Sequence, residues 1–206
     1  MLLIGRDLSP FVRRTAITLN LLGIEYERRQ VAALDAVEEI RQYNPLARVP
    51  TLVIDDEAII DSAAIIDYAL ELTADHQTLL AGAGVVRRIT LRQSAIATGA
   101  MEKAVVAGYE VGQRPPEYVY EPYRQRVLGQ VLAALTELNQ SLGEDEFFGG
   151  AQPNLADVNA VVAFDFTGLL AKDARQMRDD LDLINLRELA TRANAIEAFA
   201  KTQWRG

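Results

Sequence analysis

Residues 44–62 constrain the fold most, because this short run specifies a loop, a β-hairpin and the start of a helix. Residues 51–54 and 58–60 are β-branched and apolar, and Asp55-Asp56 between them supplies turn residues, so the run predicts a hairpin. Directly after it, Ser62 is predicted to cap a helix whose apolar residues recur at helical spacing. A helix start presents free backbone N–H groups, which favour a carboxylate ligand.

The same mixture of strands and helices extends over residues 1–72. The pattern predicts strands at 2–5 and 24–30, helices at 10–22 and 33–43, and then the hairpin and its helix. The resulting order, β-α-β-α-β-β-α, calls for a mixed sheet covered by helices.

Strand signals disappear after residue 72. We therefore predict a first domain at 1–74, a linker at 75–84 and an all-helical domain at 85–206, with helices at 85–111 and 117–142 and shorter ones up to Trp204. A further helix opens at Asn154, and Asp157 three residues later completes a capping box. A capping box explains both residues, so we assign them to folding alone.

The chain contains no cysteine and a single histidine, His76. Disulfides, thiolate metal sites and cysteine nucleophiles are therefore excluded, and any thiol chemistry must use a thiol brought by the ligand. His76 lies in a polar stretch without a partner at ligand spacing, so we expect no metal site and no Ser-His-Asp hydrolase.

The net charge is −8, which argues against binding the phosphate backbone of nucleic acids. No apolar run approaches the roughly 18–20 residues that a membrane span needs. The apolar start of the chain meets Arg6 and Asp7 too early for a signal peptide. We expect a cytoplasmic protein that binds neither nucleic acid nor membrane.

Three motifs together resemble the bacterial glutathione S-transferases. They are S-P-F-V-R-R from Ser9, N-P-x-x-R-V-P from Asn44 and D-S at Asp61, and the helical half with its capping box follows them. The resemblance covers essentially the whole chain and points to the serine type. It implies a thioredoxin-like domain followed by a helical bundle, a homodimer and a role in detoxification. It also implies glutathione as co-substrate, with no other cofactor.

The resemblance also implies which residues hold glutathione. Pro50 would follow a cis bond, the Val49 backbone would pair with the tripeptide, and Ser9 would face the sulfur. Arg48 could reach the glycine carboxylate, although a solvated loop charge is an equal alternative. The full implied set is Ser9, Phe11, Arg48, Val49, Pro50, Asp61 and Ser62.

The physical case for Ser9 rests on acidity. A free thiol with a pKa of about 8.5 is only a few per cent thiolate at neutral pH. A hydroxyl that donates to sulfur at a helix N-terminus lowers that pKa through a hydrogen bond and the helix dipole. Ser9 followed by Pro10 also fits a plain N-cap, and the two roles are compatible. Arg13, one turn further, is expected at the surface.

The partner substrate is expected to be a small hydrophobic electrophile. Met101, Val105 and Tyr109 fall at helical spacing and would line its pocket, although they fit core or dimer contacts equally well. Three function classes follow. The first is a transferase that uses the glutathione thiolate. The second is a glutathione-dependent reductase. Because no protein cysteine can form the mixed-disulfide intermediate, this class is reduced to a peroxidase in which glutathione alone reduces the peroxide. The third is a non-catalytic glutathione-binding or regulatory protein.

Overall fold

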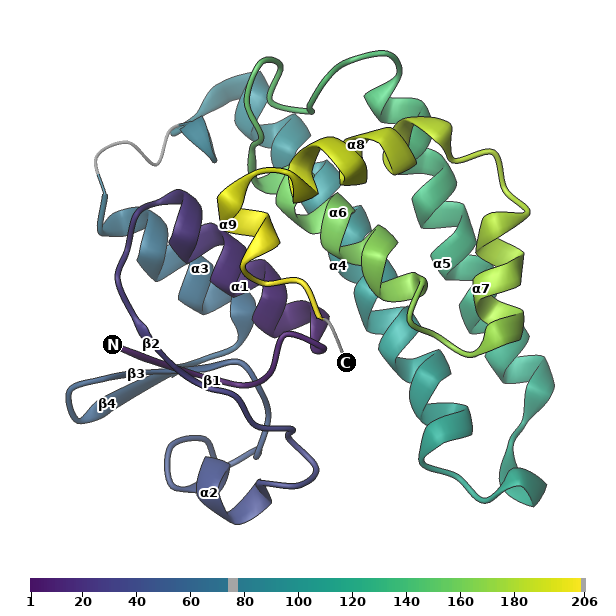
Figure 1. Ribbon diagram of the computed structural model, residues 1–206, viewed down its shortest axis with the longest axis horizontal. Coiled ribbons are helices and arrows are strands. Elements are labelled where there is room, and N and C mark those ends of the chain that lie inside the picture. Colours follow the sequence, from purple (N-terminus) through teal and green to yellow (C-terminus); the bar gives the residue numbers. More distant parts are fainter. Residues whose placement is uncertain (74–77, 205–206) are drawn as a thin grey trace. The chain divides into compact units, whose positions relative to one another are not determined.

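The computed structural model describes residues 1–73 and 78–204 (Figure 1). It divides into two compact units. The first contains Met1–Leu80 together with the chain from Asn194 onward, and the second contains Ala81–Ala193. Residues 75–77 of the predicted linker, which include His76, lie outside the described residues.

The first unit has the predicted order of elements. These are β1 (Leu2–Ile4), α1 (Pro10–Leu21), β2 (Glu27–Arg29), α2 (Val37–Arg41), β3 (Thr51–Ile54), β4 (Glu57–Ile60) and α3 (Ser62–Glu71). Strand β2 and helix α2 are shorter than predicted. β2 is an edge strand that pairs only with the short β1, so its regular part cannot extend beyond that partner.

The strands form one sheet in the order β2-β1-β3-β4, with β1 parallel to β2 and antiparallel to β3. The register decides where the loops meet. Ile4 pairs with Thr51, and Thr51 pairs with Ile60. The loop after β1, the residue before β3 and the residue after β4 therefore lie at one end of the sheet. The sheet and its flanking helices confirm the predicted thioredoxin-like domain.

Helices α1 and α3 pack together on one side of the strands, and α2 lies on the other side (Figure 1). The core between the strands and these two helices is apolar. Its residues are almost fully buried: Leu3, Val12, Ala16, Leu19, Leu52, Ile65 and Ala69.

Gly5 lets the backbone at the end of β1 pass close to Val12 and Val49. A Cβ there would lie 2.5 Å from Val12 Cγ2 and 2.9 Å from Val49 Cβ, and its φ is +129°. Only glycine fits this position without displacing a neighbour.

The end of the chain belongs to the first unit, whereas the predicted helical domain ran on to residue 206. Helix α9 (Glu197–Ala200) packs on α1, and Phe199 is fully buried. The Asn20 side chain donates to the Ala198 carbonyl over 3.0 Å, and Tyr26 donates to Asn20 Oδ1 over 2.9 Å. These contacts fix the segment to the first unit.

The second unit is helical, as predicted. Its elements are α4 (Gly84–Gly112), the 3₁₀ turn η2 (Pro116–Tyr118), α5 (Glu121–Leu142), α6 (Leu155–Thr167), α7 (Lys172–Asp179) and α8 (Ile184–Asn194). Helix α4 packs against both α5 and α6, and α6 is the most buried helix of the unit. The predicted helix from 117 starts later, because residues 116–118 close into the 3₁₀ turn before α5 begins.

The capping box of α6 is confirmed and does more than predicted. Asn154 Oδ1 accepts from Ala156 N at 2.7 Å, and Asp157 accepts from Asn154 N at 2.8 Å. Asp157 also accepts from Phe148 N at 2.8 Å and Gly149 N at 3.2 Å, so it holds the preceding loop as well. Burial raises the pKa of this carboxyl to about 6.

Across residues 1–73 and 78–204, no helix combines the length and apolar character that crossing a bilayer requires. Within the same ranges, no three histidine, cysteine, aspartate or glutamate side chains gather as a metal site would need.

Candidate functional site

The site predicted from the sequence converges at the end of the sheet where Ile4, Thr51 and Ile60 align. The loop after β1 carries Ser9. Its backbone is fixed by two hydrogen bonds, from Arg6 N to Val31 O at 3.0 Å and from Ser9 N to Arg6 O at 3.0 Å. The loop is thus anchored both to the chain beyond β2 and to itself, so Ser9 has a defined place.

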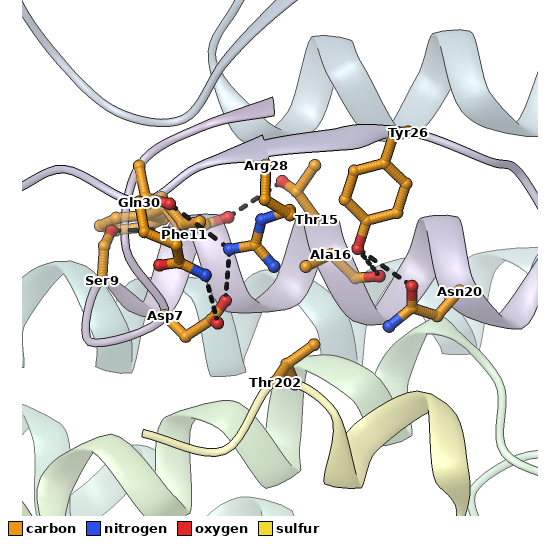
Figure 2. A network of polar contacts seen from close by, with 12 residues as sticks. Asp7, Ser9, Phe11, Thr15, Ala16, Asn20, Tyr26, Arg28, Gln30 and Thr202 are labelled. Atoms are coloured by element: carbon orange, nitrogen blue, oxygen red, sulfur yellow. Dashed lines mark hydrogen bonds and ion pairs between the residues drawn. The ribbon is translucent and has the colours of Figure 1, made fainter. Parts of the chain in front are cut away.

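Ser9 is the N-cap of α1, as predicted, but it caps weakly. Its Oγ accepts from Val12 N over 3.4 Å, near the limit for a hydrogen bond, and Pro10 has no N–H to offer. Among the described residues, none accepts the Ser9 hydroxyl proton and none pairs with the Phe11 N–H. The start of α1 therefore presents a hydroxyl and an N–H at the positive end of a helix (Figure 2).

A polar cluster around Arg28 of β2 supports this loop (Figure 2). Arg28 Nη2 lies 2.7 Å from Asp7 Oδ1, and Gln30 donates to Asp7 Oδ2 at 3.0 Å. Asp7 stands two residues before Ser9 and is largely buried. An unpaired carboxylate there would oppose a thiolate nearby, and Arg28 neutralises it.

The loop before β3 is shaped by Asn44, to which the sequence reasoning gave no role of its own. Its side chain is buried, donates to Arg48 O at 3.0 Å and to Thr51 Oγ1 at 3.1 Å, and accepts from Leu46 N at 3.0 Å. The signal available in the sequence was an asparagine before proline at a loop start, where the amide can replace backbone partners.

This loop delivers the predicted Val49-Pro50 unit. The Val49–Pro50 bond is cis, as the resemblance implied. Within the described part of the chain, the N–H and C=O of Val49 have no partner. Arg48 is exposed, and no described residue pairs with its guanidinium. Ala47 adopts a φ of +50°, a left-handed conformation that costs a non-glycine residue about 1 kcal/mol.

The start of α3 corrects one prediction. Asp61, not Ser62, is the N-cap: its Oδ1 accepts from Ala63 N at 2.8 Å, and its φ is +76°. Ser62 is the first residue of the helix and is 5% exposed. Because Asp61 caps the helix, the Ser62 hydroxyl is left without a partner among the described residues.

The three residues predicted to line the electrophile pocket lie on α4, in the second unit. Met101 is fully buried and offers no surface to a ligand, Val105 is partly buried, and Tyr109 is 51% exposed. The structure thus places Met101 in the core, one of the alternatives for these residues, and leaves Tyr109 available.

One basic residue, Arg13, and one aromatic residue, Trp204, lie in places that the sequence analysis did not predict. Arg13, expected at the surface, is buried and donates to Asn194 Oδ1 at 2.9 Å. Trp204 lies 5.4 Å from the Arg6 guanidinium, measured to the ring centroid. It therefore contacts the loop that carries Ser9, although nearly the whole chain separates the two in sequence.

A cavity of about 660 Å³ lies elsewhere in the first unit. Its lining comes from the first residue, the end of α1, the loop into β2, β2 itself and the C-terminal segment: Met1, Asn20, Ile24, Glu25, Tyr26, Glu27, Arg28, Lys201 and Thr202. None of the predicted glutathione residues lines it. Burial raises the pKa of Tyr26, which stays a neutral donor to Asn20.

Comparison with known proteins bears on this arrangement. Residues 3–77 match the family model of the glutathione S-transferase N-terminal domain. A probable glutathione S-transferase of Glycine max is 29% identical over 79% of this chain and 69% of its own length. A maleylacetoacetate isomerase of Rhizobium meliloti is 30% identical over 70% of this chain and 71% of its own.

Solved structures share the fold. A glutathione S-transferase from Methylobacillus flagellatus, crystallised with glutathione bound, superposes with a TM-score of 0.85 at 24% identity and covers 98% of each chain. With the sheet register, the family model and the relatives in agreement, this chain belongs to the glutathione S-transferase family.

Proposed function

We propose that the first unit binds glutathione and activates its thiol for attack on a hydrophobic electrophile. The observation that carries this is the meeting, at one end of the sheet, of groups that lack partners among the described residues: the Ser9 hydroxyl, the Val49 backbone and the Ser62 hydroxyl. Unpaired hydrogen-bonding groups in fixed positions favour a polar ligand, because a donor or acceptor left without a hydrogen bond costs free energy.

Each group has a distinct role in this proposal. The N–H and C=O of Val49 pair with the backbone of the tripeptide as a neighbouring strand would. Ser62 and Asp61 Oδ2, which has no partner among the described residues, hold the γ-glutamyl end. There the carboxylate meets the start of α3, and the ammonium meets Asp61. Arg48 reaches the glycine carboxylate, and Phe11 and Pro50 complete the walls.

The chemical step follows from Ser9. Its hydroxyl donates to the glutathione sulfur, and the N-terminus of α1 adds positive potential, so the thiolate becomes the favoured form. Each unit by which the thiol pKa falls corresponds to about 1.4 kcal/mol. The thiolate sulfur then forms a bond to the electrophilic carbon, and the leaving group departs with the bonding electron pair.

The test combines binding with turnover. Calorimetry should detect glutathione, and an activated aryl halide should be conjugated. Ser9→Ala is expected to lower kcat about tenfold or more while glutathione affinity changes by less than a few-fold. Ser141→Ala, which removes an exposed hydroxyl from α5, is the matched control and should change neither.

The alternatives give other results. Glutathione binding without conjugation, but with peroxide reduction, would identify a peroxidase. Binding without either would identify a non-catalytic protein. Unchanged turnover in Ser9→Ala would show that the hydroxyl only caps α1.

The isomerase relative from Rhizobium meliloti favours a second candidate, a glutathione-dependent isomerase. The same thiolate would add to a conjugated double bond, permit rotation and leave again. Glutathione would then be recovered unchanged, whereas a transferase consumes it. Measuring free thiol during turnover of a cis-configured unsaturated acid separates the two.

A further inference from the structure

We propose that Arg6 and Trp204 bind the electrophile, and that this electrophile is a planar molecule carrying an anionic group such as a carboxylate. The proposal rests on the proposed function and adds the substrate class to it. It starts from the stacking of the Arg6 guanidinium on the Trp204 ring, 5.4 Å from its centroid.

Arg6, one member of the pair, lies on the loop that carries Ser9, and Trp204 contacts that loop through it. Ser9 N donates to Arg6 O at 3.0 Å, so Arg6 and Ser9 are the two ends of one tight turn. Whatever contacts Trp204 is thus next to the loop that positions the sulfur. An electrophile held there would have its reactive carbon within reach of the thiolate, which is what proximity catalysis requires.

Trp204 is held in place and is also accessible. The chain just before it is anchored, because Thr202 is 1% exposed and donates to Phe199 O at 2.9 Å. The Arg6 guanidinium also stacks on the ring. Even so, 37% of Trp204 remains exposed. An ordered, partly open indole is suited to stacking against a planar unsaturated group.

Arg6 supplies the charge. In the described ranges, no residue accepts a hydrogen bond from its guanidinium or forms an ion pair with it. By contrast, Arg28 is paired with Asp7 and Arg29 with Glu39. An arginine whose donors have no partner within those ranges, set beside an aromatic ring, favours a ligand with a carboxylate. In a chain of net charge −8, such a local cation is what an anionic substrate needs.

The first experiment measures preference. An activated aryl chloride that bears a carboxylate is compared with the same ring bearing a carboxamide. Arg6→Gln is expected to lower the ratio of kcat/KM values, carboxylate over carboxamide, about tenfold. Lys201→Gln removes one positive charge from the same C-terminal segment and is the matched control, because Lys201 is exposed and paired with Glu197. It should leave the ratio unchanged.

The second experiment does not depend on turnover. Trp204 is the only tryptophan of the chain, so its fluorescence reports on this position alone. The glutathione conjugate of the carboxylated ring should quench it, and Arg6→Gln should weaken that quenching. Trp204→Leu should raise KM for both aryl chlorides several-fold, and Trp204→Phe should restore most of the loss.

Two results would overturn the proposal. One is an unchanged preference ratio in Arg6→Gln. The other is a loss of glutathione affinity in that variant, measured by calorimetry, which would assign Arg6 to glutathione instead. The failure of the proposed function is a different result: the wild-type protein would then not bind glutathione at all.

Discussion

Helices α1 and α6 both begin at a polar N-cap residue, and the two starts use their hydrogen-bonding groups very differently. At α6, Asn154 and Asp157 satisfy each other's backbone and the N–H groups of the preceding loop. At α1, Ser9 makes one long bond and keeps its hydroxyl proton unused among the described residues. We call the start of α6 a saturated cap, because its hydrogen-bonding groups are paired within the protein, and such a cap stabilises the fold. The start of α1 is an unsaturated cap, which leaves hydrogen-bonding groups for a ligand.

The largest effect is expected at the saturated cap. Asp157→Asn places an amide N–H₂ against backbone N–H donors that the Asp157 carboxyl group accepted, so at pH ~4.5 we expect a loss of about 3 kcal/mol in the free energy of unfolding. Urea denaturation measures it. Asp145→Asn, at an exposed position of the same unit, is the control and should cost less than about 0.5 kcal/mol. A similar cost for both variants would remove the contrast between the caps.

The same residue makes the contrast depend on pH. Burial raises the pKa of Asp157 from 3.8 to about 6. Its protonation stabilises the fold fully below the unfolded pKa of 3.8, and this contribution is lost as the pH rises through 6. The gap in unfolding free energy between wild type and Asp157→Asn should therefore narrow from pH ~4.5 to ~7.5, by about 1 to 3 kcal/mol. A gap that widens would contradict the assignment.

At the unsaturated cap of α1, a substitution should change stability little and the bound thiol strongly. Ser9→Ala removes a bond of 3.4 Å, so we expect a loss of less than about 1 kcal/mol in stability. In the same variant the pKa of bound glutathione should rise by about one unit, since the donor to sulfur is lost. The pH dependence of the thiolate absorbance gives this pKa. A stability loss as large as that of Asp157→Asn would make Ser9 a structural cap.

The smallest change in stability is expected at the third cap, Asp61. Asp61→Gly loses a cap bond but relieves a φ of +76°, so the two effects should cancel to within about 0.5 kcal/mol. Glutathione affinity should still fall several-fold. Asp55→Gly, at a φ of +50° in the hairpin turn, is matched in conformation and should leave affinity unchanged. Equal affinity in both variants would exclude Asp61 from the site.

Local patterns explain what the sequence could predict. The hairpin, the capping box of α6 and the start of α1 are set by residues a few positions apart, and each was located to within a few residues. The cap of α3 was misplaced by one residue, because Asp61 and Ser62 are both good caps and only the positive φ of Asp61 decides between them.

Long-range contacts account for the rest. Arg13 was placed at the surface because its partner Asn194 lies far along the chain. Trp204 was assigned to a helical domain for the same reason, although it stacks on Arg6. Periodicity describes an element and its faces, but it carries no information about which distant segment returns to cover them.

The return of the last segment has a consequence for how the protein is made. The second unit is continuous, and all of its residues leave the ribosome before the first unit has its full chain. Phe199, which is fully buried in the first unit, can reach its place only after residues 81–193 have been made. The first unit, although most of it is translated first, is therefore completed after the second unit has been synthesised, and the Ser9 loop gains its contact with Trp204 only then.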